Sequence, residues 1–262
     1  MSVSQSRSAG AFLFRPRSWR RVLRFAGLAI AASVSPSTYT PAARAVAVRQ
    51  IYLTAWQILR SYTLISALMS WILIEIVVVA ARRYGIERFS LELVMSVLVL
   101  EVVPLMTALF VALRSGAAIG AEIAIACVRG DLDDRAEAES SPLHVELVPR
   151  IAGAALSVAA LTTIGCLVTV WLAYTMFYGF TSAGMDEFSR IVANVFDGPE
   201  LAGFILKCLL FGFAVAVIPA AAALEAERGV LKSLPAVVLG GLVKLFFVIA
   251  VIQVGSLMVK YA

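Results

Sequence analysis

Charged side chains are scarce in this sequence. They make up only 15% of the 262 residues, whereas 61% are hydrophobic and the mean hydropathy is +0.92. Soluble domains carry about 25% charged and about 45–50% apolar residues. The chain therefore lacks the polar surface that a soluble globule of this size needs, and its composition predicts an integral membrane protein.

The residue types that ligate metals or carry catalysis are equally sparse. The chain has one histidine, His144, and three scattered cysteines, without the spacing of a zinc site or of a disulfide framework. It also has no GxxxxGK[ST] motif, which excludes a P-loop. We therefore expect no catalytic residue, no metal site and no cofactor in this chain, and no enzymatic activity.

Five apolar stretches are long enough to cross a membrane, since a hydrocarbon core of ~30 Å needs about 20 helical residues. They lack the alternation of a β-barrel, and a helix satisfies its own backbone in lipid. The predicted spans are Tyr62–Ala81, Leu91–Leu113, Ile151–Tyr178, Leu201–Leu224 and Leu234–Val259. The predicted fold class is therefore an all-α integral membrane protein, with a five-span domain over residues 45–262.

The N-terminal arm, residues 1–44, is basic. Residues 1–60 hold nine arginines and no lysine or acid, which suits the anionic cytoplasmic leaflet better than nucleic acid, so we expect no nucleic acid partner. In a helix, apolar residues such as Trp19 and Leu23 would face lipid while arginines such as Arg20 meet the headgroups, which predicts an interfacial helix. Arg20-Arg21 and the apolar run after it also resemble a cleavable signal, and the Arg- and Ser-rich, acid-free composition resembles a transit peptide.

Basic residues also predict the orientation. With the N-terminus inside, the inner segments hold 15 Lys/Arg and the outer segments five, so the positive-inside rule favours N-in and C-out. Residues 114–150 then form a cytoplasmic segment, in which Asp131, Asp133 and Asp134 form either a solvated loop or a docking surface. Residues 184–197 show amphipathic helical spacing and are predicted to lie on the outer face.

Charges within spans are costly in lipid and are candidates for function. Glu101 lies in the middle of the second span, and Pro104 leaves backbone groups nearby that need partners. Glu101 therefore either makes an internal helix–helix hydrogen bond or lines a substrate cavity. Lys207 and Lys244 either extend toward the two membrane surfaces or pair with acids.

One stretch resembles a known family. Glu101-Val-Val-Pro104, followed by Arg114-Ser-Gly116-Ala-Ala118-Ile-Gly-Ala121-Glu122, resembles the signature of the MlaE/YrbE permeases, E-x-x-P and then R-x-G-x-A-x-x-A-E. The likeness covers most of residues 15–262. Val103 replaces the usual glycine of E-[LV]-G-P, and an acidic stretch replaces the usual coupling sequence after residue 129, so the chain resembles a divergent member.

The resemblance implies the permease subunit of an ABC transporter that moves phospholipid or another lipid. It implies a homodimer in the bacterial inner (cytoplasmic) membrane, with a lipid cavity at the dimer axis. A cytoplasmic ABC ATPase would hydrolyse ATP and dock on the segment after Glu122, and a periplasmic MCE-domain protein would lie above.

The resemblance also suggests site residues. Glu101 and Tyr84 match family positions, and the remaining candidates share a helical face with Tyr84 or flank Glu101. The candidate lipid-binding residues are Leu73, Ile76, Val77, Ala80, Tyr84, Glu101, Val102 and Leu105. The candidate ATPase-coupling residues are Arg114, Glu122, Asp131, Asp133 and Asp134.

Two other functions compete with transport. A degenerate family member would anchor the ATPase and MCE partners as a scaffold and move no lipid. An intramembrane enzyme using Glu101 and His144 is a poor alternative, because no nucleophile–base pairing is visible in the sequence.

The predicted orientation can be tested by labelling single cysteines in a cysteine-free background. Because of the excess of Lys/Arg in the inner segments, a cysteine at Ser182 should react with an impermeant thiol reagent added to intact cells, and one at Ser140 should react only after lysis. Labelling of position 140 in intact cells would refute the orientation.

Overall fold

The computed structural model describes residues 56–86, 89–129, 148–223 and 234–261, together with Val48 and Tyr52. These residues are helical apart from short turns, and they contain no strand. Five of the helices are long and apolar enough to cross a membrane, which confirms the predicted class. The predicted interfacial helix of residues 1–44 lies outside the described residues.

The second span differs from the others in being a single helical stretch of five segments. Two of these segments, η4 and η5, are π-helical, so backbone N–H groups bond to the carbonyl five residues earlier instead of four. The spans are α4 (Gln57–Tyr84); α5 (Ser90–Leu93), η4 (Val94–Val102), α6 (Val103–Val111), η5 (Ala112–Gly116) and α7 (Ala117–Arg129); α9 (Val148–Tyr178); α11 (Gly198–Ala223); and α12 (Leu234–Tyr261).

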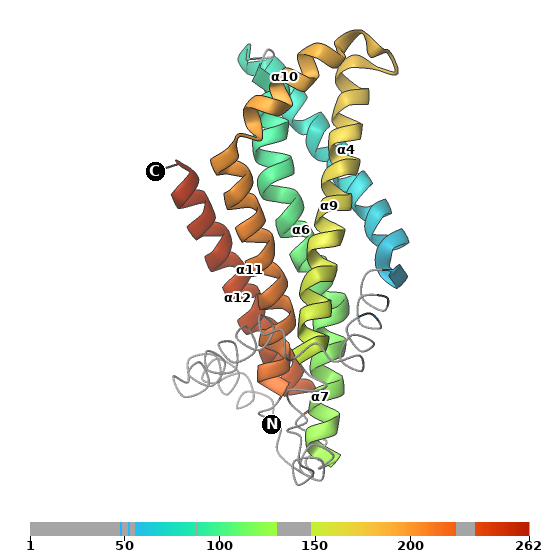
Figure 1. Ribbon diagram of the computed structural model, residues 1–262, viewed down its shortest axis with the longest axis vertical. Helices are drawn as coiled ribbons and strands as arrows, with labels where there is room; N and C mark the ends of the chain where they lie inside the picture. Colours follow the sequence, from blue (N-terminus) through green and yellow to red (C-terminus); the bar gives the residue numbers. More distant parts are fainter. Residues whose placement is uncertain are drawn as a thin grey trace, which may run out of the picture.

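Successive spans run in opposite directions, with α7 at one end of the bundle and α10 (Met185–Val195) across the other (Figure 1). A short 3₁₀ turn, η7 (Ser182–Gly184), leads into α10. Phe188 and Val195 of α10 are buried, and the Phe188 ring meets the ring of Tyr174 edge to face at 5.1 Å. Amphipathic α10 therefore packs its apolar face on the bundle, in the segment where an amphipathic helix was predicted.

The second span extends well beyond its predicted end at Leu113. It continues as a helix over Ser90–Ile125, 36 residues, or roughly 54 Å at about 1.5 Å per residue, which exceeds the ~30 Å hydrocarbon core. Gly116 and Gly120 allow the extension to pack closely on α11, because a Cβ at either position would lie 3.4–3.5 Å from the Pro219 ring. The apolar first part of the predicted polar segment 114–150 is therefore a packed helix.

Hydrogen bonds between spans add to this packing. The Tyr62 hydroxyl on α4 lies 2.6 Å from the Thr107 hydroxyl on α6, and the Ser70 hydroxyl on α4 lies 2.7 Å from the Thr169 hydroxyl on α9. All four side chains are buried. Such pairs hold helices together in a membrane, where apolar surfaces have no hydrophobic drive to associate.

The contact between α9 and α11 depends on the absence of a side chain at Gly212. A Cβ at Gly212 would lie 2.8 Å from the carbonyl oxygen of Ala155, which is backbone and cannot rotate away. At Gly203, on the same helix, an added Cβ meets no atom within 4 Å.

Gly212→Ala should therefore lower the thermal stability of the purified full-length chain in detergent. We expect a loss of about 1–3 kcal/mol from overpacking, whereas the control Gly203→Ala should be neutral or gain about 0.5–1 kcal/mol from helix propensity. Equal melting temperatures for the two variants would show that the close contact has no effect on stability.

Candidate functional site

Pro104 creates an unusual backbone at the centre of the second span. It has no N–H, so the carbonyl of Leu100 four residues earlier has no α-helical donor. Val103 N–H bonds to the Leu98 carbonyl, five residues back, which is the π-helical pattern of η4. The Lys207 ammonium group donates to the Leu100 carbonyl at 3.1 Å, and the Cys166 thiol donates to the Val99 carbonyl at 3.6 Å. Side chains of α11 and α9 therefore satisfy the carbonyls near Pro104.

Glu101 and Lys207 form a buried ion pair between η4 and α11. Their side chains are 7% and 3% exposed, and the Lys207 ammonium group donates to Glu101 Oε2. Gln253 of α12 donates to the same oxygen at 2.8 Å. Because Glu101 needs a donor, the Gln253 amide turns its nitrogen toward the carboxylate and leaves its own Oε1 without a partner. The sequence allows two roles for Glu101, an internal hydrogen bond or a place in a cavity wall. In the structure Glu101 belongs to an internal network and also lines the cavity described below.

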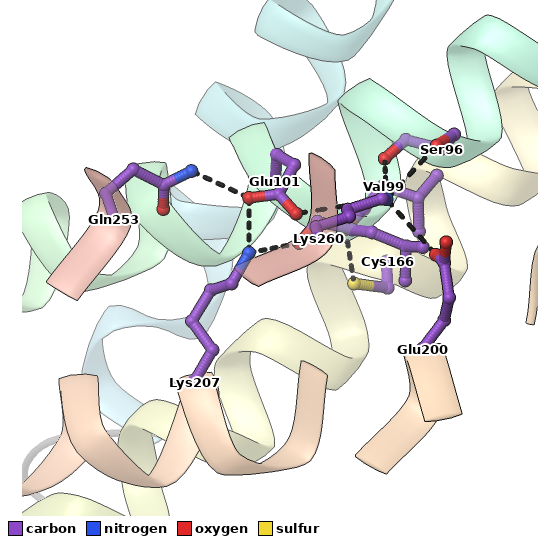
Figure 2. A network of polar contacts seen from close by, with 9 residues as sticks. Ser96, Val99, Glu101, Cys166, Glu200, Lys207, Gln253 and Lys260 are labelled. Carbon is purple, nitrogen blue, oxygen red and sulfur yellow. Dashed lines mark hydrogen bonds and ion pairs between the residues drawn. The ribbon is translucent and has the colours of Figure 1, made fainter. Parts of the chain in front are cut away.

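Lys260, near the end of α12, extends this network to the end of the bundle where α10 lies. Its ammonium group lies 3.1 Å from Glu200 Oε2 on α11 and 3.9 Å from Glu101 Oε1. It also donates to the hydroxyl and the carbonyl of Ser96, at 3.1 and 3.3 Å (Figure 2). Glu101, Glu200, Lys207 and Lys260 are called the charged cluster below. The cluster has two carboxylates and two ammonium groups.

The charged cluster lines one side of a cavity of about 560 Å³ between α11 and α12. This volume falls within the ~300–1,000 Å³ range of small-molecule sites. The rest of the wall is mostly apolar and includes Phe204, Leu206, Leu210, Ile252 and Val259. Apolar walls beside a compact set of charges suit an amphiphilic molecule, whose tails avoid water and whose headgroup needs polar partners.

The predicted lipid-binding residues do not all lie beside this cavity. Glu101 lines it, whereas Leu73 and Val102 line a separate cleft of about 30 Å³ on the α4 side of η4. Ile76 and Tyr84 on α4 are 57% and 80% exposed. Three further candidates are partly buried: Val77, Ala80 and Leu105. The candidates on α4 are called the α4 stripe below: Leu73, Ile76, Val77, Ala80 and Tyr84. Within one chain, the structure therefore places the α4 stripe and Glu101 on different faces.

The predicted coupling residues lie toward the opposite end of the bundle. Arg114 in η5 and Glu122 in α7 are both exposed. Asp131, Asp133 and Asp134 lie outside the described residues, as does His144.

Sequence reasoning missed Ser96 and three larger polar side chains of the network. Glu200 and Lys260 were assigned to the outer segments, and Gln253 is an uncharged residue in an apolar span. One signal was available, because Glu200 and Lys207 are seven residues apart and therefore lie on one helical face, about 10 Å apart along the axis. Gln253 and Lys260 have the same spacing on α12.

The family model described as Permease MlaE matches residues 47–258 of this chain. The match covers the first four membrane-spanning helices completely and the fifth up to residue 258. It includes every residue of the charged cluster except Lys260, which lies two positions beyond it. No curated protein matches the chain.

The buried ion pair predicts the effect of removing one partner. Glu101→Leu should destabilise the purified chain by about 3–5 kcal/mol, because Lys207 keeps a buried charge without its carboxylate. The double variant Glu101→Leu/Lys207→Met should recover much of this loss, although the Leu100 carbonyl then lacks its donor at a cost of about 1–3 kcal/mol. Thermal unfolding in detergent measures both effects.

Glu92→Leu, at an exposed residue of α5, serves as the control and should leave the melting temperature nearly unchanged. If Glu101→Leu behaves like this control, the ion pair makes no contribution to stability.

Proposed function

The chain belongs to the MlaE permease family, whose members are membrane permeases of ABC-type transporters, and from this premise we propose that its cargo is a phospholipid or another lipid. The observation that supports a lipid is the cavity between α11 and α12, with its apolar wall beside the charged cluster. An acyl chain fits the apolar wall and a polar headgroup fits the charges. A small polar solute would leave most of that wall without a matching surface.

We further propose that the functional unit is a homodimer. Only 17% of the apolar window of α4 is buried within the chain, so a second copy has a large helical face on which to pack. A two-fold pair would place the two α4 stripes around a shared space. In that pair, lipid contacts at the shared space would come from Leu73, Ile76, Val77, Ala80 and Tyr84, together with Val102 and Leu105. Glu101 would instead contact lipid from the cavity between α11 and α12.

The proposal assigns ATP hydrolysis to a separate cytoplasmic subunit, because this chain has no P-loop. That subunit would dock near Arg114 and Glu122 and on the acidic run of Asp131, Asp133 and Asp134. With the predicted orientation, α10 and the charged cluster lie at the outer side of a bacterial inner membrane. A periplasmic MCE-domain protein would receive or deliver lipid there.

Transport then requires that ATP binding changes the affinity of the cavity for lipid. A conformational change can capture or release a lipid only if the two conformations bind that lipid with different free energies. The long helix from Ser90 to Ile125 joins the proposed ATPase end directly to Glu101. A shift of α7 would therefore be transmitted along a continuous element to the charged cluster.

Filling the cavity tests the lipid proposal. A side chain at Gly255 on α12 would enter the cavity, where an added Cβ meets no atom within 4 Å. Gly255→Trp should lower the phospholipid that stays bound to the purified chain after detergent washing by about tenfold, or ~1.4 kcal/mol of binding free energy, because the indole takes space in the cavity that lipid would occupy. Quantitative mass spectrometry measures the lipid retained per protein.

Leu239→Trp is the matched control, because Leu239 is an exposed residue of α12 that does not line the cavity. The control should keep its lipid. If both variants retain as much lipid as the unmodified chain, the cavity does not hold the cargo. If the unmodified chain retains no lipid but still binds an ATPase, the scaffold function is favoured instead.

A further inference from the structure

The two lysines of the charged cluster are held in different ways. Lys207 is 3% exposed and bonds both to Glu101 and to the Leu100 carbonyl that Pro104 leaves without a donor. Moving Lys207 would leave a buried carboxylate and a buried carbonyl unsatisfied. Lys207 is therefore a fixed charge of the fold.

Lys260 and Glu200, by contrast, lie in the more accessible part of the cluster. Their side chains are 14% and 37% exposed, and the pair between them is 3.1 Å long. Both residues line the cavity. Because both side chains are more exposed than those of Glu101 and Lys207, a bound headgroup can reach this pair and replace one or both partners.

The cluster as a whole is electrically neutral, because two carboxylates balance two ammonium groups. An anionic headgroup would bring one uncompensated negative charge into a site with apolar walls, and an unpaired charge in such surroundings is costly. A headgroup with one phosphate and one ammonium group would keep the site neutral. Its phosphate can replace Glu200 beside Lys260, and its ammonium group can pair with the released Glu200 carboxylate.

We propose that the charged cluster makes the cavity selective for lipids with zwitterionic phosphate–ammonium headgroups over anionic phospholipids. Lys260 binds the phosphate, Glu200 binds the ammonium group, and Glu101 with Lys207 forms the fixed base of the site. This proposal rests on the proposed lipid cargo and deepens it by naming the headgroup class. It also assigns specificity to Lys260 and Glu200.

Lipid competition tests the proposal. The full-length chain is reconstituted in vesicles of equimolar phosphatidylethanolamine and phosphatidylglycerol with identical acyl chains, extracted in mild detergent and washed. Mass spectrometry then gives the ratio of the two lipids that stay bound. We expect phosphatidylethanolamine to be enriched about tenfold, of the order that one charged hydrogen bond supplies.

Charge variants should move this ratio in opposite directions. Glu200→Gln leaves the cluster with one excess positive charge, so the bound ratio should shift toward phosphatidylglycerol by at least several-fold. Lys260→Gln leaves one excess negative charge and removes the phosphate partner, so total retained lipid should fall and phosphatidylglycerol should fall most. Glu92→Gln, at an exposed glutamate of α5 that does not line the cavity, should leave the ratio unchanged.

The outcomes separate this inference from the proposed function. Retained lipid whose composition equals that of the vesicles, or is enriched in phosphatidylglycerol, overturns the headgroup selectivity and leaves the lipid cargo standing. The headgroup selectivity is also overturned if Glu200→Gln and Glu92→Gln retain phosphatidylethanolamine and phosphatidylglycerol in the same ratio. Failure of the unmodified chain to retain either lipid overturns the cargo proposal and the selectivity together.

Discussion

The buried ion pair of Glu101 and Lys207 is the interaction on which the polar site depends, and its position follows from Pro104. Proline removes one helical donor, and a bare carbonyl in a membrane interior needs a replacement. Lys207 supplies that donor from α11, and its charge in turn requires a carboxylate nearby. One backbone defect therefore fixes a lysine, a glutamate and the amide of Gln253 at a single depth of the bundle.

The same arrangement explains why a cavity forms between α11 and α12. The two helices are in close contact where Gly241 meets Ala222, since a Cβ at Gly241 would lie 2.9 Å from the Ala222 methyl group. Toward the end where α10 lies they line the open cavity, and the pair of Lys260 with Glu200 spans them at 3.1 Å. Apolar packing thus joins α11 and α12 at the end near Gly241, and the Lys260–Glu200 ion pair joins them at the other end.

The sequence predicted the parts of the fold that depend on composition and spacing alone. Five apolar stretches appear as five helices, and Glu101 with Pro104 was identified as a place where polar partners are needed. Pairing with an acid was one of two alternatives for Lys207, and the structure shows that pair. Which groups meet at Glu101 could not be assigned, because the approach of Lys207, Gln253 and Lys260 to one carboxylate depends on how three spans pack.

The extension of the second span through residues 114–125 was missed for the same reason. The polar Arg114 indicated a membrane boundary, but Gly116 and Gly120 pack on Pro219 of a distant span and keep the chain helical. The face of α4 is a related case, since an apolar stripe is identical in sequence whether it meets lipid, a second copy or a substrate. The role of the α4 face in binding lipid therefore remains a prediction, and it depends on the proposed homodimer.

An experimental density map of the full-length chain in lipid nanodiscs tests the central claim most directly. The account predicts that the Lys207 ammonium group contacts both the Leu100 carbonyl and Glu101, and that elongated lipid density lies between α11 and α12 and ends beside Lys260. A map in which Glu101 has no contact with Lys207, or in which side chains fill the space between α11 and α12, would contradict the account.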